Sequence, residues 1–346
     1  MRLDYPLYLE DIKAIFQNSD LHNQTFFITG SSGLIMSFLI DGLMYLNLFA
    51  GRQIHIYATF SNPQSLQKSC SQYLGHHCFH PLIQDITQPI NLDIRADYII
   101  HAASNTHPQL YNAQPVETIM LNLAGTKNVL DFARACPDAR CLFLSSFEVY
   151  GQPQQNAHLA ETDIGLLDFT QVRSCYPESK RLGENLCQAY HSEYKLNTLI
   201  ARLGYIYGPT VNLNSSKADV QFLNCALNHQ DIILHSSGEQ PRSYCYVADA
   251  VSGLLTILQR GAVGEIYNLT NTTETVSLKQ FAAKLANLSG VNLKFSFPTN
   301  GAGSANYASS SLMSTDKIQA LGWKPLFNFD IGISHTYYLK KEPAKC

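Results

Sequence analysis

Short runs of apolar residues alternate along the chain with longer segments in which apolar residues recur at helical spacing. The run Thr25–Thr29 stops at a glycine, and a helical pattern follows it over Leu34–Leu48. The other compact apolar runs that we interpret as buried strands are Ile54–Ala58, Tyr98–Ala102, Cys141–Ser145 and Thr198–Arg202. Helical patterns at Pro115–Ala135 and Ser174–Tyr194 lie between several of them. Strands that alternate with helices predict an α/β fold, a doubly wound parallel sheet with helices on both faces.

The pattern changes beyond Pro209, where a polar loop precedes a short helix and a short strand. A helix at Tyr246–Arg260 and a strand at Glu265–Leu269 then return to the first pattern, so this strand should rejoin the sheet. Gly301–Ser311 is rich in small polar residues and predicts an exposed loop. We therefore predict a smaller, discontinuous C-terminal lobe, with the chain divided into residues 1–205 plus about 245–270, and residues 206–244 plus 271–346.

Composition and charge exclude several classes of partner. The 346 residues are 45% hydrophobic and 15% charged, which is typical of a globular protein, and the net charge is −3. That balance offers no basic surface for nucleic acid or an anionic membrane. No apolar run is long enough to span a bilayer, and the first residues do not form a secretory signal. Nine cysteines without a CxxC pair fit reduced thiols, so we expect a cytoplasmic protein.

A cluster of potential metal ligands lies in one segment, at Cys70, His76, His77, Cys78 and His80. Their spacing matches no tetrahedral motif, so we expect a loop with a short strand and no bound metal.

The glycine turn after the first strand is a candidate dinucleotide site. Backbone N–H groups at the start of a helix can bind a pyrophosphate, whereas the alternative is an ordinary tight turn. The residues concerned are Gly30, Ser32, Gly33, Leu34 and Ile35. Met36 occupies the position of the third glycine of the usual fingerprint, so we expect the helix to sit differently or to bend.

The segments that follow the second and third strands are less informative about the cofactor. The segment 58–63 holds neither an acid for a ribose hydroxyl nor an arginine for a 2′-phosphate, so NAD and NADP both stay open. Asp85 follows the third strand and can bind an adenine amino group or simply form a solvated turn.

Tyr176 and Lys180 lie four residues apart in a helical pattern and should share one face. A nearby ammonium favours the phenolate, so we expect Lys180 to make Tyr176 a base at neutral pH. Ser146, just after a predicted strand, can bind the same substrate hydroxyl. A surface helix pair is the alternative for the two helical residues, but the order of glycine turn, serine, tyrosine and lysine favours catalysis.

Nine motifs together resemble the extended short-chain dehydrogenases, the NAD-dependent nucleotide-sugar epimerase, dehydratase and decarboxylase family with a Rossmann fold. They are Thr29-Gly30-x-x-Gly33, Asp85-Ile86, Ile99–Ala103, Asn122-x-x-Gly125-Thr126, Ser145–Gly151, Tyr176-x-x-x-Lys180, Arg202 with Tyr207–Pro209, Gly238–Arg242 with Tyr246–Asp249, and Leu321–Pro325. The resemblance covers nearly the whole chain. It implies an NAD-binding larger domain, a lobe that binds a nucleotide-sugar, and a homodimer joined through the helices Pro115–Ala135 and Ser174–Tyr194.

The resemblance also implies roles for individual residues. It assigns Ser146, Tyr176, Lys180 and Glu148 to catalysis. The residues implied near NAD, besides the glycine turn, are Asp85, Ile86, Ala102, Ala103, Asn122, Tyr176 and Lys180. The residues implied near the substrate are Ser104, Ser146, Phe147, Tyr205 and Arg242, with Arg242 on the diphosphate.

Two residues after Ser145 and Ser146 bear on the reaction that follows oxidation at C4. Phe147 stands where similar 4,6-dehydratases have an aspartic acid that protonates the departing hydroxyl, so dehydration is disfavoured. Glu148 is present as in UDP-glucuronate decarboxylases. Decarboxylation is therefore our leading hypothesis, and 4-epimerisation is the alternative. A non-catalytic dinucleotide sensor is a further alternative, supported by Met36 and by Tyr205, which replaces an asparagine of many relatives.

Overall fold

The computed structural model describes residues 2–341 except 107, 153–157 and 298–311. Its centre is a seven-stranded sheet in the order β11-β6-β5-β4-β1-β2-β3, and every neighbouring pair is parallel. The strands are β1 (Thr25–Thr29), β2 (His55–Phe60), β3 (Phe79–Ile83), β4 (Tyr98–His101), β5 (Arg140–Ser146), β6 (Asn197–Leu203) and β11 (Ile266–Leu269). The predicted doubly wound fold is therefore confirmed, including the return of the strand near residue 266 to the main sheet.

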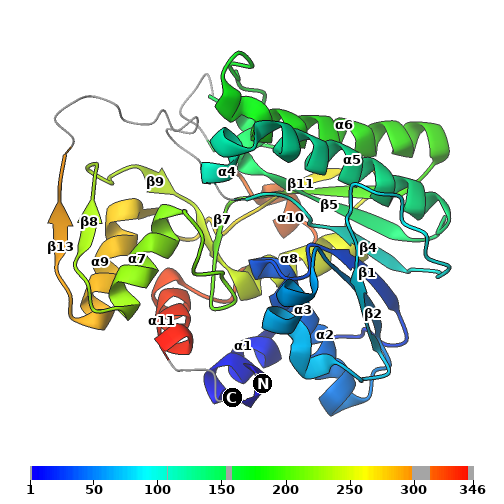
Figure 1. Ribbon diagram of the computed structural model, residues 1–346, viewed down its shortest axis with the longest axis horizontal. Helices are drawn as coiled ribbons and strands as arrows, with labels where there is room; N and C mark the ends of the chain where they lie inside the picture. The colour runs from blue at the N-terminus through cyan, green and yellow to red at the C-terminus, as the bar shows by residue number, and fades with distance from the viewer. Residues whose placement is uncertain (1, 107, 153–157, 298–311, 342–346) are drawn as a thin grey trace.

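Helices cover both faces of this sheet (Figure 1). On one face α5 (Pro115–Arg134) and α6 (Cys175–Tyr194) lie side by side, with α4 (Pro108–Ala113) close to them. The helices on the other face are α2 (Leu34–Ala50), α3 (Pro63–Cys70) and α8 (Val247–Arg260). The central strands β1, β4, β5 and β6 are buried on both faces, which explains why they are continuous apolar runs in the sequence. Short 3₁₀ helices at Arg2–Asp4, Ser71–Tyr73, Phe147–Tyr150 and Val172–Ser174 complete this part.

Local signals account for the helix boundaries. α2 starts at Gly33, whose backbone is extended, and ends at Gly51 in the left-handed conformation. Pro115 occupies the first turn of α5, where its missing N–H costs nothing. α9 (Leu278–Ser289) begins with a capping box between Ser277 and Gln280.

Smaller elements gather at one end of the sheet and form the second lobe (Figure 1). They are β7 (Tyr205–Tyr207), α7 (Ala218–Leu227), β8 (Ile232–Leu234), β9 (Pro241–Arg242), β10 (Tyr244–Tyr246), β12 (Val276–Ser277), α9, β13 (Leu293–Phe295) and α11 (Phe329–Lys341). The short helix α10 (Asp316–Gln319) packs instead against β11 and α8. Three two-stranded sheets, β10-β7, β12-β9 and β13-β8, lie among the elements of this lobe. The last two of them join a segment from before the strand β11 to a segment from after it. The expected loop at 301–311 lies outside the described residues.

The first helix, α1 (Pro6–Phe16), ties the two parts together. Asp11 is buried and its carboxylate accepts hydrogen bonds from Tyr246 at the start of α8 (2.5 Å) and pairs with His335 of α11 (2.8 Å). This helix therefore packs against elements of both parts. No helix in the described part of the chain is long and apolar enough to cross a membrane.

Candidate active site

The glycine turn lies between β1 and α2, beside the end of β4. From β1 the strand order runs through β2 to β3 on one side, and from β4 to β11 on the other side of β1. Ligands of such folds bind in the crevice at the strand ends where this order reverses. Gly30 has φ +70°, and a Cβ there would lie 2.8 Å from the backbone of Ala102 and Ala103. Thr29 Oγ1 accepts hydrogen bonds from both of these backbone amides, at 3.1 and 3.2 Å. Only glycine therefore fits at position 30.

The start of α2 is open to a ligand. Ser32 and Gly33 are exposed, whereas Leu34 and Ile35 are half-buried, so amides of the first turn can point to a bound anion. Met36 is buried in the core, and α2 continues unbroken to Ala50. The expected bend at Met36 is thus absent, because the core accommodates the methionine side chain.

A buried polar chain runs from this loop to the helix of the predicted base. His101 contacts Thr29 (2.8 Å) and Thr126 (3.2 Å) through its two ring nitrogens. Asn122 donates from Nδ2 to Ser179 on α6 (2.8 Å), whereas its buried Oδ1 has no partner among the described residues. Burial, and then the charge of Lys180, lower the pKa of His101 to about 3, so this ring is neutral.

The predicted catalytic residues come together although they lie on different elements. Ser146 is the last residue of β5, and its Oγ accepts a hydrogen bond from the backbone of Glu148 (3.2 Å). Its side chain also lowers the pKa of Tyr176, against the larger effect of burial. Lys180 Nζ lies 6.0 Å from the centre of the Tyr176 ring and donates to the backbone carbonyl of Leu144 (2.9 Å). All three side chains are buried.

Burial dominates the electrostatics of this group. It raises the pKa of Tyr176, and the Glu148 charge adds to this rise, so the net shift is opposite to the one expected from Lys180 alone. Burial also lowers the pKa of Lys180 to about 8, and Glu184 partly opposes this shift. Glu184 itself is held by Arg202 (2.7 Å) and by the hydroxyl of Ser145 (2.6 Å).

Glu148 lies beside Tyr176 as a charged carboxylate. Arg173, in the turn before α6, donates from Nη2 to Glu148 Oε2 at 2.7 Å. The guanidinium also lies 4.5 Å from the centre of the Tyr111 ring. Tyr111, from α4, stacks on Tyr176 with ring centres 4.6 Å apart and planes at 13°.

The predicted substrate residues form a second group in the lobe. Phe147 is buried and packs on Tyr205, with ring centres 4.5 Å apart. The guanidinium of Arg242 lies 4.6 Å from the Tyr205 ring centre, and the charge of Asp219 helps to keep it protonated. Tyr244 lies next to Tyr205, at 5.5 Å. A cation backed by aromatic rings is suited to an anionic ligand.

Other predicted residues have local partners. Asp85 is exposed, and its Oδ1 accepts from the amide and hydroxyl of Thr87, as in a solvated turn. Ile86 is buried, and Ser104 Oγ donates to the carbonyl of Asn105 (3.2 Å). Ligand atoms of His76, His77 and Cys78 lie within 4.8 Å of one another, and the absence of a metal there stays a prediction.

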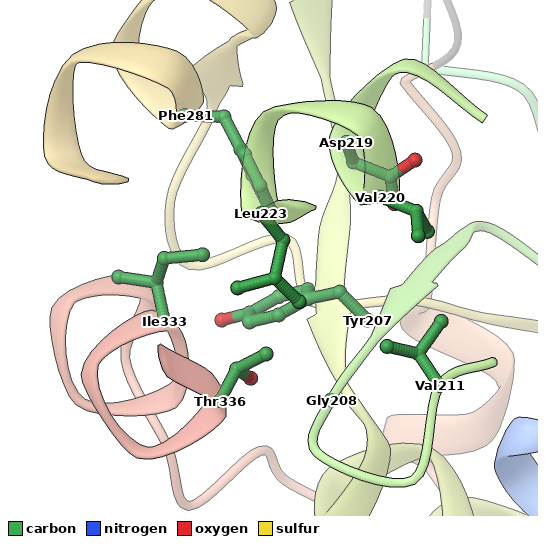
Figure 2. Close-up of a pocket in the computed structure, with 9 residues that line it drawn as sticks. All are labelled: Tyr207, Gly208, Val211, Asp219, Val220, Leu223, Phe281, Ile333 and Thr336. Atoms are coloured by element: carbon green, nitrogen blue, oxygen red, sulfur yellow. The ribbon is translucent and has the colours of Figure 1, made fainter. Parts of the chain in front are cut away.

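Sequence reasoning missed Tyr111, Arg173 and Glu184. Arg173 lies three residues before Tyr176, a spacing that offered a signal, whereas Tyr111 comes from a short helix with no apolar periodicity. A small cavity of about 10 Å³ in the lobe contains none of the predicted catalytic residues, and Figure 2 shows Tyr207 among its lining side chains Leu223, Ile333 and Thr336. It has room for about one water molecule, not for a nucleotide-sugar.

Comparisons with known proteins agree with this geometry. Residues 26–270 match the model of the NAD dependent epimerase/dehydratase family. The chain is 29% identical over 325 residues to UDP-glucuronic acid decarboxylase 1 of Xenopus tropicalis, covering 94% of this chain and 74% of the relative. It is 34% identical over 263 residues to UDP-glucuronic acid decarboxylase 6 of Arabidopsis thaliana, covering 74% of each chain.

A solved structure extends the likeness to three dimensions. UDP-glucuronic acid 4-epimerase from Bacillus cereus, in complex with UDP-glucuronic acid and NAD, superposes with a TM-score of 0.76 at 20% identity. The match covers 92% of this chain and 99% of that one. At this identity, the likeness establishes the fold.

Proposed function

Since the chain belongs to the NAD-dependent epimerase/dehydratase family, we propose that it decarboxylates UDP-glucuronate through a transient 4-keto sugar. We infer the substrate from the relatives of Xenopus tropicalis and Arabidopsis thaliana, because both are named UDP-glucuronic acid decarboxylases. The observation that carries the reaction is the pair Phe147 and Glu148 beside Ser146 and Tyr176.

Oxidation at C4 requires a base and a group that orients the sugar hydroxyl. Tyr176 takes the hydroxyl proton, and Ser146 binds the same oxygen. Lys180 supplies a buried ammonium whose pKa of about 8 keeps it mostly protonated at neutral pH. Bound NAD supplies the hydride acceptor and returns the hydride at the end of the cycle.

The residues of this structure fit a dinucleotide. The exposed first turn of α2 offers amides for the pyrophosphate, and Gly30 leaves room that a Cβ would fill. Asn122 Oδ1 is a buried acceptor without a described partner, which is costly unless a ligand or water binds it. We propose NAD over NADP because the matching family is described as NAD dependent and the similar solved structure holds NAD.

The step after oxidation follows from what surrounds Glu148. Phe147 has no proton to donate to a departing hydroxyl, and the Glu148 carboxyl group is held in a pair with Arg173. Elimination of water therefore has no acid at these two positions. A β-keto acid loses CO₂ without such an acid, so decarboxylation suits this site.

The domain roles and the location are part of the same proposal. Residues 1–205 and about 245–270 would hold NAD, and residues 206–244 and 271–346 would hold the nucleotide-sugar, with Arg242 on the diphosphate. The cysteine pattern favours the reducing cytoplasm.

The test is to incubate the protein with NAD and a panel of UDP-, dTDP-, GDP- and CDP-sugars and to follow product mass and C4 configuration. We expect UDP-glucuronate to lose CO₂ with no lasting accumulation of NADH, since the hydride returns to the sugar. Tyr176→Phe should lower turnover by about 10²–10⁴-fold.

Other products would change the assignment. Unchanged mass with inverted C4 would establish a 4-epimerase, and loss of water would contradict the argument from Phe147. NAD binding without any altered sugar would favour the sensor alternative.

A further inference from the structure

Arg173 makes two contacts that connect it to the predicted base by separate routes. Its Nη2 lies 2.7 Å from the Glu148 carboxylate, and its Cζ lies 4.5 Å from the Tyr111 ring centre. Tyr111 in turn stacks on Tyr176. The side chains of Arg173 and Glu148 are only 27% and 19% exposed, so water screens this pair less than a surface ion pair.

The stack is geometrically specific. The Tyr111 and Tyr176 planes are only 13° apart, and the guanidinium carbon of Arg173 lies over the Tyr111 ring. The Tyr111 side chain also lowers the pKa of Tyr176 and so opposes part of the rise that burial causes. The thiol of Cys175 contacts the carbonyl of Tyr111 (3.4 Å) and links α4 to the start of α6. A guanidinium on an aromatic face restrains the ring that it covers.

Charges and titratable groups surround Tyr176 from five elements. Ser146 comes from β5, Glu148 from the 3₁₀ turn that follows it, and Tyr111 from α4. Arg173 lies in the turn before α6, and Cys175 and Lys180 lie on α6 itself. The negative charge of Glu148 opposes formation of a phenolate at Tyr176, and the positive charge of Arg173 favours it.

We propose that Arg173 and Tyr111 are positioning residues of this active site. Arg173 neutralises Glu148 beside Tyr176 and fixes Tyr111 on the Tyr176 ring, so that the phenol hydroxyl keeps one orientation toward Ser146. This inference rests on the proposed oxidation by Tyr176, and it holds whether the oxidised sugar then loses CO₂ or is epimerised.

The first test is a double-mutant cycle on the oxidation half-reaction. Enzyme-bound NADH is followed by its absorbance in single turnovers with UDP-glucuronate between pH 6 and about 10. Arg173→Gln leaves the Glu148 charge uncompensated and should move the acid limb of the profile up by about one pH unit. Glu148→Gln should move it down, and the double variant should return it toward the wild-type position.

A conservative change separates charge from orientation. Arg173→Lys keeps the cation but loses the planar contact with Tyr111, so its acid limb should stay near that of the wild type. Its rate of NADH formation should still fall about tenfold, with KM changed less than kcat. A structural role alone would not produce opposite pH shifts in Arg173→Gln and Glu148→Gln.

Tyr111 variants test the stack directly. Tyr111→Phe keeps the ring and should retain the rate within about threefold, whereas Tyr111→Leu should lower it by about tenfold or more. Equal rates in these two variants would overturn the role of the ring.

Lys317→Gln is the matched control. Lys317 also pairs with a carboxylate, Glu265 (2.6 Å), and lies over an aromatic ring, Tyr267 (5.0 Å), but at the amino end of β11. Neither its rate nor its pH profile should change. Unfolding midpoints and NAD titrations of all variants identify any that fail to fold.

The outcomes distinguish this inference from the function on which it depends. If the wild type forms NADH and Arg173→Gln leaves the acid limb in place, the inference is overturned and the proposed function stands. If the wild type converts no sugar to a product, both are overturned.

Discussion

At the scale of single residues, the site is characterised by charged groups that are buried in the folded protein. Lys180 is buried with one backbone carbonyl, from Leu144, as its hydrogen-bond acceptor, and its pKa is lowered to about 8. The shift from 10.5 means that the folded protein holds the protonated lysine at a cost of about 3 kcal/mol at pH 7. Such a cost is expected where a buried group serves function and not stability.

Replacing this lysine should therefore stabilise the protein while abolishing its activity. We expect Lys180→Met to raise the free energy of unfolding at pH 7 by about 2 kcal/mol, since the lost hydrogen bond to Leu144 offsets part of the gain. Because the native pKa is below the unfolded one, the wild type gains stability as pH rises from about 8 toward 10.5, so the advantage of the variant should disappear there. Urea unfolding at pH 7 and at about pH 10 measures both values.

The control for that experiment is Lys13→Met, at an exposed position of α1. It should show no pH-dependent gain. An equal gain in the two variants would contradict the burial argument.

At the scale of elements, the strand ends bring the chemistry together. β1 ends at the glycine turn, β4 ends at the chain from His101 to Ala103, and β5 ends at Ser146. Since parallel strands share one carboxyl edge, these three ends meet there. α6 then supplies Tyr176 and Lys180 from one helix face. Asn122 of α5 holds α6 in place by a hydrogen bond to Ser179.

Glycine substitutions test the contact between two of these elements. Gly30→Ala introduces a Cβ only 2.8 Å from the backbone at Ala102, at a position that already has φ +70°. We expect it to reduce NAD affinity at least tenfold and to destabilise the protein by about 1–3 kcal/mol. Calorimetric NAD titration and chemical unfolding measure the two effects.

Gly51→Ala is the matched variant, because Gly51 has φ +60° but no atom within 4 Å of its added Cβ. It should cost about 1 kcal/mol of stability and leave NAD affinity unchanged. The same loss of affinity in both variants would show that backbone strain, and not the close approach to β4, limits binding.

At the scale of the whole molecule, α5 and α6 present an exposed apolar surface. The exposed fractions are 65% for Val116, 38% for Ile119, 48% for Met120 and 41% for Leu182. These two helices are the ones through which we expect a homodimer, and an apolar surface of this kind is typical of an interface.

The dimer is tested by light scattering at micromolar concentration. We expect a dimer for the wild type and a monomer for Met120→Glu, because a buried carboxylate at an apolar interface is strongly unfavourable. Phe49→Glu, at a residue 63% exposed on α2, should stay a dimer. A monomeric wild type would overturn the expectation.

The sequence by itself determined the fold class, the order of the strands and helices, and the grouping of Ser146, Tyr176 and Lys180. These features depend on local patterns, namely apolar runs, helical spacing and a glycine turn after a strand, which a linear sequence records directly. Strand boundaries differed by one or two residues, as at β2, which spans His55–Phe60 where we expected Ile54–Ala58. Residue roles drawn from family resemblance stay predictions until they are measured.

Only the tertiary structure decided how charge and rings are arranged around the base. The pair of Arg173 with Glu148, the stack of Tyr111 on Tyr176 and the packing of Phe147 on Tyr205 join residues that are distant in the chain. The direction of the Tyr176 pKa shift likewise depends first on burial and then on the charge of Glu148, which both raise the pKa. Desolvation and long-range contacts are properties of the folded chain, so no spacing in the sequence could reveal them.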